Sequence, residues 1–253
     1  MKILLYISFI GTNYCGYQAQ SNGISVQRKL NEAAFALFGF ECDVTGCSRT
    51  DSGTHANMFC ATIAKKGERG IEISIPAEKI PVAFSRHLPA DIAVFAARFV
   101  PDDFHARYDV VYKEYIYKIH DSPLRDPFFH DRAWHIPRAF GTDDIARMNR
   151  ACAYLLGKKD FSSFMAQGSR ITDATRTVLY AGVFRDLQGL ICFKIAADGF
   201  LYNMVRIIAG TLADVAAGKL EPEDMERIIA GRDRSLASVT APAHGLYLNK
   251  VVY

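Results

Sequence analysis

Apolar residues follow two spacings along this chain, and the spacings predict an alternation of strands and helices. Short, almost wholly apolar runs are typical of strands inside a sheet, and such runs cover residues 2–10, 58–63, 92–99, 178–185, 190–197 and 246–252. Residues 112–119 alternate instead, which places Tyr115 on the same strand face as Tyr117. Apolar residues three and four positions apart predict amphipathic helices, which begin near residues 25, 142, 200 and 221.

Small and polar residues mark where these elements begin and end. Ser25 is a favourable cap for the first helix, and Gly39 ends it. Thr142 is expected to cap the second helix and Gly157 to close it. Residues 186–189, Asp-Leu-Gln-Gly, separate two apolar runs and predict a β-hairpin.

Each half of the chain begins with a strand and continues through a long loop, a capped helix and further strands. This order predicts an α/β protein of the α+β type, built from two related subdomains whose sheets join around a central cleft. Residues 101–107 have the polar composition of a junction. We therefore expect an N-terminal subdomain over residues 1–103 and a C-terminal subdomain over residues 104–253.

Composition places the chain among globular proteins that bury a large core. It has 253 residues, of which 50% are hydrophobic and 23% charged. No apolar run is long enough to span a membrane, and Met1–Tyr6 reads as a first strand rather than a signal peptide, so a cytoplasmic location is expected. The six cysteines form no C-x-x-C pair, which favours reduced, mostly buried thiols over a zinc site, with Cys47 in a packing role.

The net charge of +3 permits nucleic-acid binding without demonstrating it. Basic residues nevertheless recur in expected loops, at Lys65, Lys66, Arg69, Arg125, Arg132, Lys158, Lys159, Arg170, Arg176, Arg232 and Arg234. Each one alone is typical of a solvated surface. Together they could supply the salt-sensitive backbone contacts that a folded RNA requires.

The stretch from Gly46 to Ala56 is the strongest candidate for chemistry. Arg49, Thr50 and Asp51 stand together between small residues. An arginine two residues from a carboxylate lowers the pKa of that carboxyl group, and an ionised carboxylate in an enclosed site can act as a nucleophile or a base. The alternative is that Asp51-Ser52-Gly53 is simply a turn, because these residue types dominate turns.

The third predicted helix carries a second polar feature. Arg206 lies opposite its apolar stripe, together with Asn203 and Gly210. This spacing is typical of a solvated face. In a functional interpretation, Gly210 leaves room beside Arg206, which then reaches into the cleft.

Short motifs occur in order over nearly the whole chain. They are Gly16-Tyr17-Gln18, Ser25-Val26-Gln27, Arg49-Thr50-Asp51 with Gly53 and His55, Leu88-Pro89-Ala90-Asp91-Ile92, Phe104-His105-Ala106-Arg107, Lys113-Glu114-Tyr115-Ile116-Tyr117, Met204-Val205-Arg206 and Gly245-Leu246-Tyr247-Leu248. In this order and spacing the chain resembles the tRNA pseudouridine synthases of the A type. The resemblance implies a joined, mixed, mainly antiparallel sheet, a homodimer, folded tRNA as partner, and no cofactor or metal.

The resemblance also implies an activity and a set of site residues. The family converts uridines of the anticodon stem-loop, at tRNA positions 38, 39 and 40, to pseudouridine. Asp51 falls on the catalytic aspartate (nucleophile or base), Arg49 on the motif arginine, Tyr115 on the active-site tyrosine and Arg206 on the arginine paired with the aspartate. The substrate-binding residues that it implies are Tyr115, Leu246, which lines the cleft, Thr50 and Gln18.

These residue types suit the isomerisation of a base. The bond from ribose C1′ to base N1 breaks, the base turns, and C1′ is rejoined to C5. The base must first be flipped into a pocket, where Tyr115 can stack on it. Asp51 can then stabilise the charge that develops at the sugar, attack it, or remove its proton, while Arg206 keeps Asp51 ionised through a charge-assisted hydrogen bond.

Some positions depart from the pattern of the family. Ser48, Ser52 and Thr54 stand where glycine, alanine and valine are usual, Tyr17 replaces a tryptophan, and Ala19 an arginine. Residues 85–87 replace a stretch that usually contains asparagine. The catalytic positions are retained, so these changes bear on which uridines are chosen.

Two other function classes fit parts of the sequence. A carboxylate-based glycosidase needs a second carboxylate opposite Asp51, yet Glu114 points to the opposite strand face from Tyr115 and Asp91 is expected in a turn. A non-catalytic RNA-binding protein would keep the basic loops, but it would not need Asp51, Tyr115 and Arg206 together.

Overall fold

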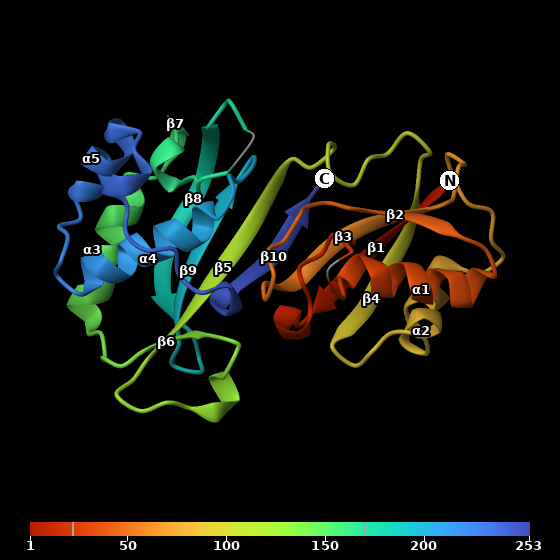
Figure 1. Ribbon diagram of the computed structural model, residues 1–253, viewed down its shortest axis with the longest axis horizontal. Helices are drawn as coiled ribbons and strands as arrows, with labels where there is room; N and C mark the ends of the chain where they lie inside the picture. The colour runs from red at the N-terminus through yellow and green to blue at the C-terminus, as the bar shows by residue number, and fades with distance from the viewer. Residues whose placement is uncertain (22, 169–170) are drawn as a thin grey trace. The chain divides into compact units, whose positions relative to one another are not determined.

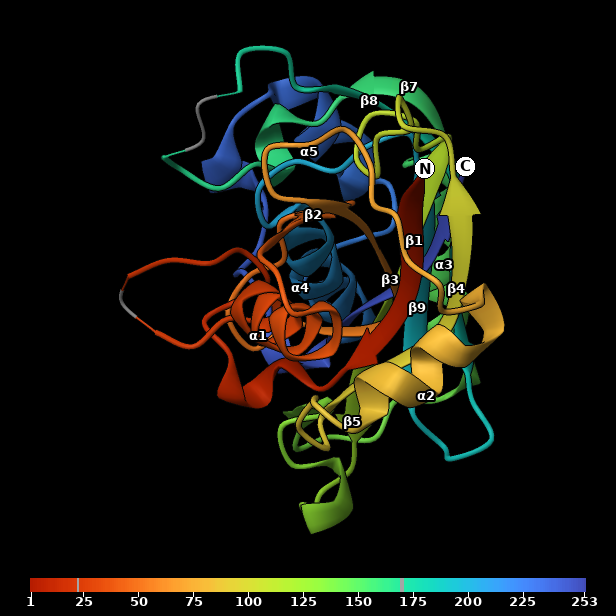
Figure 2. The ribbon, with the colours of Figure 1, turned by 90° about the vertical axis from the view of Figure 1, so that its right-hand side faces the viewer.

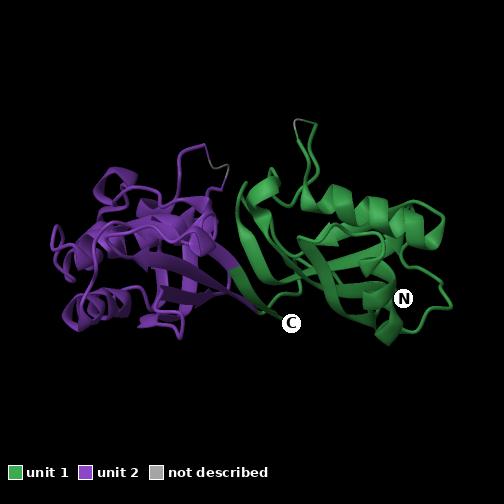
Figure 3. Ribbon diagram, turned by 90° about the horizontal axis from the view of Figure 1, so that it is seen from below, with its two compact units in different colours: residues 1–111, 248–253 green, residues 112–247 purple. Residues whose placement is uncertain are grey.

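The computed structural model describes residues 1–21, 23–168 and 171–253 (Figure 1). The predicted RNA contact at Arg170 lies outside the described residues. The chain divides into two compact units: unit 1 comprises Met1–Val111 and Leu248–Tyr253, and unit 2 comprises Tyr112–Tyr247 (Figure 3). The subdomain boundary expected between residues 103 and 104 stays a prediction.

Unit 1 is built on an antiparallel sheet. Its strands follow the order β4 (Ile92–Val100), β1 (Lys2–Phe9), β3 (His55–Lys65) and most of β10 (Leu246–Val252), and β2 (Cys42–Gly46) also pairs with β3. The central strand β1 is buried on most of its length, and the side chains of Ile3, Leu5 and Ile7 have no exposed surface. Its nearly continuous apolar sequence is therefore explained by its place inside the sheet.

Two helices of unit 1 cover the sheet (Figure 2). Helix α1 (Val26–Phe38) packs against β2, and α2 (Ile80–Ser85) packs against β4 after the 3-10 turn η2 (Ala77–Lys79). The two helices meet through Phe38 and Phe84, whose rings lie edge to face with centroids 6.1 Å apart. The predicted ends of α1 are confirmed: Ser25 Oγ accepts a hydrogen bond from the Arg28 N–H at 3.2 Å, and Gly39 ends the helix with φ 77°.

Unit 2 carries a mixed sheet. The strands β5 (Tyr112–Asp121), β9 (Ile191–Ala197), β8 (Thr175–Arg185) and β7 (Gly157–Asp160) are neighbours in that order and antiparallel. The short strand β6 (Trp134–Ile136) pairs with β5 in parallel. The predicted mixed α/β fold with mainly antiparallel pairing is thus confirmed.

The helices of unit 2 centre on α4 (Met204–Ala216), which is buried over almost its whole surface. It packs against β5 and against α3 (Thr142–Ala153), which itself covers β8 (Figure 1). Helix α5 (Asp224–Gly231) and four 3-10 turns complete the unit: η3 (Pro127–Phe129), η4 (Ser162–Phe164), η5 (Arg234–Leu236) and η6 (Ala243–Gly245). Each fully buried apolar side chain of α4 contributes about 1.5–3 kcal/mol, so α4 anchors this unit.

Several helix boundaries differ from the prediction, and α5 begins at Asp224 rather than near residue 221. Helix α3 has Gly141 rather than Thr142 as its cap, because the Asp144 carboxylate accepts a hydrogen bond from the Gly141 N–H at 2.9 Å. It ends at Ala153, and Gly157 instead begins β7. Helix α4 begins at Met204 and not near residue 200, since Asn203 takes a left-handed conformation with φ 60°.

Other features of the composition are also visible in the structure. All six cysteines are free thiols, and Cys47, Cys60, Cys152 and Cys192 are buried. In the described part of the chain, no helix is both long enough and apolar enough to cross a membrane. Cys47 has no exposed surface, which fits the packing role expected for it.

Candidate active-site residues in the two units

Asp51 lies in unit 1, in the loop that joins β2 to β3. The backbone N–H of Thr54 donates to the Asp51 carbonyl at 3.1 Å, and Gly53 has φ 77°, so residues 51–54 form a tight turn. A positive φ favours glycine at this position. The turn interpretation of Asp51-Ser52-Gly53 is therefore correct. It is compatible with catalysis because the turn fixes the backbone of Asp51 and leaves this residue half-buried.

Both ends of this loop are fixed in the core. At its start, the Cys47 N–H donates to the Cys60 carbonyl at 2.8 Å, and the Cys60 N–H donates to Cys47 Sγ at 3.4 Å. At its end, the buried His55 accepts a hydrogen bond at Nδ1 from the Gly11 N–H at 2.9 Å. Because Nδ1 is an acceptor, this ring carries its proton on Nε2 when it is neutral.

The middle of the loop rests on residues 14–17. The Tyr17 N–H donates to the Thr50 carbonyl at 3.4 Å, whereas the Tyr14 carbonyl accepts from Ser52 Oγ at 3.2 Å and from the Gly53 N–H at 3.3 Å. Gly16 has φ 100°, and a Cβ on it would lie 2.5 Å from the Thr50 carbonyl oxygen. Only glycine allows the two segments to approach so closely.

The other predicted residues of unit 1 differ in exposure. Arg49 and Gln18 are exposed, as expected of side chains that contact a large substrate. Thr50 is half-buried, and its hydroxyl has no hydrogen-bond partner among the described residues. An unpartnered buried hydroxyl costs about 1–3 kcal/mol.

Tyr115 belongs to unit 2, on β5. It lies opposite Ile195 of β9, is 7% exposed, and its ring meets Phe200 edge to face with centroids 4.9 Å apart. The strand pair and this aromatic contact fix the ring in one orientation. A fixed ring is suited to stacking because little side-chain entropy remains to be lost.

Arg206 lies in the first turn of α4, also in unit 2. Its Nε donates to the Ala241 carbonyl at 2.7 Å and its Nη1 donates to Asn203 Oδ1 at 2.7 Å, while the Ala241 N–H donates back to the Arg206 carbonyl at 3.1 Å. The side chain is half-buried. It is therefore a positioned guanidinium rather than a charge on a solvated helix face.

Gly210 does not have the role expected for it. A Cβ on Gly210 would overlap the carbonyl oxygen of Val239, so the small residue makes room for the backbone of residues 238–241 rather than for Arg206. The Ser238 N–H also donates to Thr211 Oγ1 at 3.3 Å. The prediction for Gly210 was wrong because the segment that approaches it is distant in sequence.

Leu246 follows the same segment, at the start of β10, and is 7% exposed. In the residues just before Leu246, the Pro242 carbonyl accepts a hydrogen bond from the Tyr117 hydroxyl at 2.8 Å. A Cβ on Gly245 would overlap the Tyr117 ring, so only glycine fits there. Burial raises the pKa of Tyr117, and the nearby Arg206 charge partly offsets this. Tyr117 thus lies near Arg206 and contacts the segment that leads to Leu246. The alternating pattern of β5 did not reveal this role.

The structure places the predicted residues in two groups. Unit 1 holds Gln18, Arg49, Thr50 and Asp51, and unit 2 holds Tyr115, Arg206 and Leu246. Their assembly into one site stays a prediction. Sequence reasoning gave no supporting role to Tyr14 or Tyr117. Tyr117 belongs to a quoted motif, and Tyr14 lies two residues before the motif that begins at Gly16.

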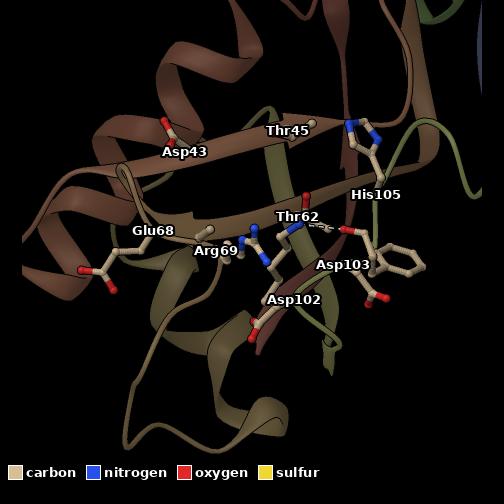
Figure 4. Close-up of a pocket in the computed structure, with 11 residues that line it drawn as sticks. Asp43, Thr45, Thr62, Glu68, Arg69, Asp102, Asp103 and His105 are labelled. Carbon is tan, nitrogen blue, oxygen red and sulfur yellow. Dashed lines mark hydrogen bonds between the residues drawn. The ribbon is translucent and has the colours of Figure 1, made fainter.

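A separate cavity of about 620 Å³ lies in unit 1 (Figure 4). Acidic, basic, polar and apolar residues line it: Lys2, Asp43, Thr45, Thr62, Ala64, Glu68, Arg69, Asp102, Asp103, Phe104 and His105. None of the candidate catalytic residues is among them, so this cavity is not the candidate site. Over the described ranges, no group of three or more His, Cys, Asp or Glu side chains is arranged to hold a metal ion.

This chain is similar over its full length to known proteins. A family model described as "tRNA pseudouridine synthase" matches residues 151–253. A protein of Thermoanaerobacter sp. (strain X514) named "tRNA pseudouridine synthase A" is 40% identical over 252 residues, covering 100% of this chain and 99% of that protein. A protein of the same name from Halalkalibacterium halodurans is 39% identical over 246 residues, covering 97% and 90%. A chain of a solved Cbf5-Nop10-Gar1 complex has a TM-score of 0.39 and 9% identity, covering 98% of this chain and 49% of that chain.

Proposed function

This chain belongs to the tRNA pseudouridine synthase A family, and we propose that it isomerises uridines of the tRNA anticodon stem-loop, at positions 38, 39 and 40, to pseudouridine. The observation that carries the proposal is similarity at 40% identity over the whole chain. The fixed turn at Asp51 and the positioned Arg206 side chain support it.

The reaction is balanced without a second reactant. The bond between C1′ and N1 breaks and a bond between C1′ and C5 forms. The proton on C5 is lost, and N1 gains a proton. Nothing is oxidised or reduced and no water is consumed, so the proposed chemistry calls on acid–base and electrostatic groups of the protein.

We assign the central role to Asp51, as nucleophile or base. The residues that flank it are hydrogen-bonded to Tyr14 and Tyr17, and these bonds support a turn backbone that is already formed before substrate binds. Arg206 is assigned as its ion-pair partner, and Arg49 as a second cation of the site. A charge-assisted hydrogen bond from a guanidinium both orients a carboxylate and keeps it ionised.

We assign substrate contacts to Tyr115, Leu246, Thr50 and Gln18. The ring of Tyr115 is fixed by its strand and by Phe200, which suits it to stack on a flipped base. Gln18 and Arg49 are exposed and can reach the RNA. We also assign phosphate contacts to the basic residues that were expected in loops. The loop prediction was wrong for Lys65, Lys158, Lys159 and Arg176, which lie in strands β3, β7 and β8.

We also propose a cytoplasmic homodimer in which both subunits contact one tRNA. Light scattering of the protein with and without tRNA tests the assembly. A strict monomer that is fully active on tRNA would contradict the dimer, but it would leave the proposed reaction unaffected.

Incubation of the protein with an unmodified tRNA transcript tests the reaction. We expect pseudouridine at anticodon stem-loop positions, with the tRNA chain intact and no free base. Release of free uracil would instead indicate a carboxylate-based glycosidase. Tight tRNA binding without any pseudouridine would indicate a non-catalytic RNA-binding protein.

A further inference from the structure

Tyr14 connects the candidate catalytic loop to the turn that leads into β4. Its backbone carbonyl accepts hydrogen bonds from Ser52 Oγ and from the Gly53 N–H, the two residues that follow Asp51. Its side chain is 5% exposed and runs the other way, so that its hydroxyl donates to Asp91 Oδ1 at 2.5 Å. One residue thus bonds to the loop through its main chain and to Asp91 through its side chain.

Asp91 is itself fixed by residues 10–14. Its carbonyl accepts from the Ile10 N–H at 2.9 Å, and its second carboxylate oxygen accepts from Asn13 Nδ2 at 3.3 Å. It immediately precedes β4, the strand that pairs with β1 along its whole length. The tie from Tyr14 therefore ends on the turn residue that leads directly into β4.

We propose that Tyr14 is a positioning residue for Asp51, acting through its hydroxyl bond to Asp91. The inference rests on the proposed function, because it assigns the purpose of this bond to the placement of the catalytic carboxylate. Without the hydroxyl bond, only the Ile10 and Asn13 bonds remain between this segment and Asp91. The Tyr14 carbonyl, which supports the turn at residues 51–54, is then held less firmly.

The chemical character of the bond suits this role. A phenol that donates to a carboxylate makes one of the shorter and stronger kinds of hydrogen bond. Burial and the neighbouring Asp91 charge both raise the pKa of Tyr14, so the hydroxyl keeps its proton and stays a donor at neutral pH. Misplacement of a reacting group by about 1 Å can cost roughly 100-fold in rate.

The test uses Tyr14→Phe, which removes only the hydroxyl. Tyr253→Phe is the matched control, because it also removes the hydroxyl of a tyrosine in unit 1. Tyr253 is half-buried, and its hydroxyl donates to the Ala106 carbonyl at 2.7 Å. Single-turnover pseudouridine formation and tRNA affinity are measured for both variants. We expect Tyr14→Phe to lower the single-turnover rate by about 10- to 100-fold with tRNA affinity within about twofold of wild type, and Tyr253→Phe to leave both near wild type.

A second pair of variants tests the partner of the bond. Asp91→Asn keeps a carbonyl oxygen that can accept from Tyr14, whereas Asp91→Ala keeps none. We expect Asp91→Asn to retain clearly more single-turnover activity than Asp91→Ala, and Asp91→Ala to add little to Tyr14→Phe in the double variant. If Tyr14→Phe does not fold, the comparison of Asp91→Asn with Asp91→Ala is the test of the proposed role of the bond.

Three results would overturn the inference: a wild-type rate in Tyr14→Phe, an equal loss in Tyr253→Phe, or equal activity of Asp91→Asn and Asp91→Ala. Asp51→Asn in the same assay distinguishes a wrong role for Tyr14 from a wrong assignment of the catalytic residue. An inactive Asp51→Asn beside a fully active Tyr14→Phe would reject only the role of Tyr14. An active Asp51→Asn would reject the assignment of Asp51 itself.

Discussion

Arg206 and Ala241 are joined by two hydrogen bonds that run in opposite directions. The guanidinium Nε donates to the Ala241 carbonyl at 2.7 Å, and the Ala241 N–H donates to the Arg206 carbonyl at 3.1 Å. The pair ties the first turn of α4 to the segment that leads to Leu246. Arg206 therefore has a structural role in unit 2 besides the catalytic role that we propose.

We expect Arg206→Ala to impair both stability and catalysis. The variant leaves the Ala241 carbonyl without its donor and removes the proposed partner of Asp51. Arg206→Lys keeps the charge but lacks the planar fork, so it should restore stability more than activity. Urea unfolding and single-turnover rates of both variants check this; Arg206→Ala with wild-type rates would contradict the proposed pairing.

Gly210→Ala should destabilise the protein by about 1–3 kcal/mol through overpacking, because the new Cβ would overlap the Val239 carbonyl. Gly141→Ala is the matched control. A Cβ on Gly141 finds no atom closer than 3.9 Å and the residue has φ −83°, so this change should cost no more than about 1 kcal/mol, the penalty of alanine at a helix cap. Equal free energies of unfolding for the two variants, measured in urea, would contradict the close packing of the Val239 backbone on Gly210.

His244 should make the stability depend on pH. Burial lowers the pKa of His244 below its ordinary value of 6.5, helped by His130 and Arg206, while Asp131 opposes the shift. The unfolded chain therefore binds more protons than the folded chain near and below pH 6.5, and the free energy of unfolding falls as the pH drops through that range.

The measurement is urea unfolding between about pH 7.5 and about pH 5.5. We expect His244→Gln to lose less stability than wild type over this range, whereas a control with the exposed His87→Gln should follow wild type. A His244→Gln variant with the wild-type dependence would show that another group is responsible.

Binding of tRNA should weaken steeply with salt, because the basic loops would displace counterions from phosphates. We expect the affinity to fall about tenfold or more between about 50 and about 200 mM salt. Filter-binding or anisotropy titrations at several salt concentrations measure the slope. Near-constant affinity over this range would weigh heavily against an RNA substrate.

Many features that depend on neighbours in sequence were predictable, although the cap and the end of α3 were not. Ser25 and Gly39 delimit α1 as expected because a cap and a left-handed C-terminal residue act within one helical turn. The paired strands of the β8–β9 hairpin follow from local periodicity and a short turn. The Asp51 turn was visible for the same reason, since Asp, Ser and Gly favour turns through local backbone interactions.

Features that depend on distant residues were not predictable in this way. Gly210 is small because the Val239 backbone packs on it, and Tyr14 bonds to Asp91 across 77 positions. No periodicity or motif spacing reveals such partners. The start of α4 was misplaced for a local reason: Asn203 takes a left-handed conformation where the hydrophobic periodicity continues.

The central claim is that Asp51 is the nucleophile or base. Asp51→Asn keeps the size of the side chain and the Asp51 carbonyl that closes the turn, but it removes the negative charge. If Asp51 were only a turn residue, this change should cost about 1 kcal/mol of stability or less and leave activity largely intact.

The most direct test is pseudouridine formation by Asp51→Asn under single-turnover conditions, with a tRNA-binding curve and an unfolding curve for the same preparation. The assignment predicts a rate lower by roughly 1,000-fold or more, with folding and tRNA affinity near wild type. A single-turnover rate close to wild type would contradict it.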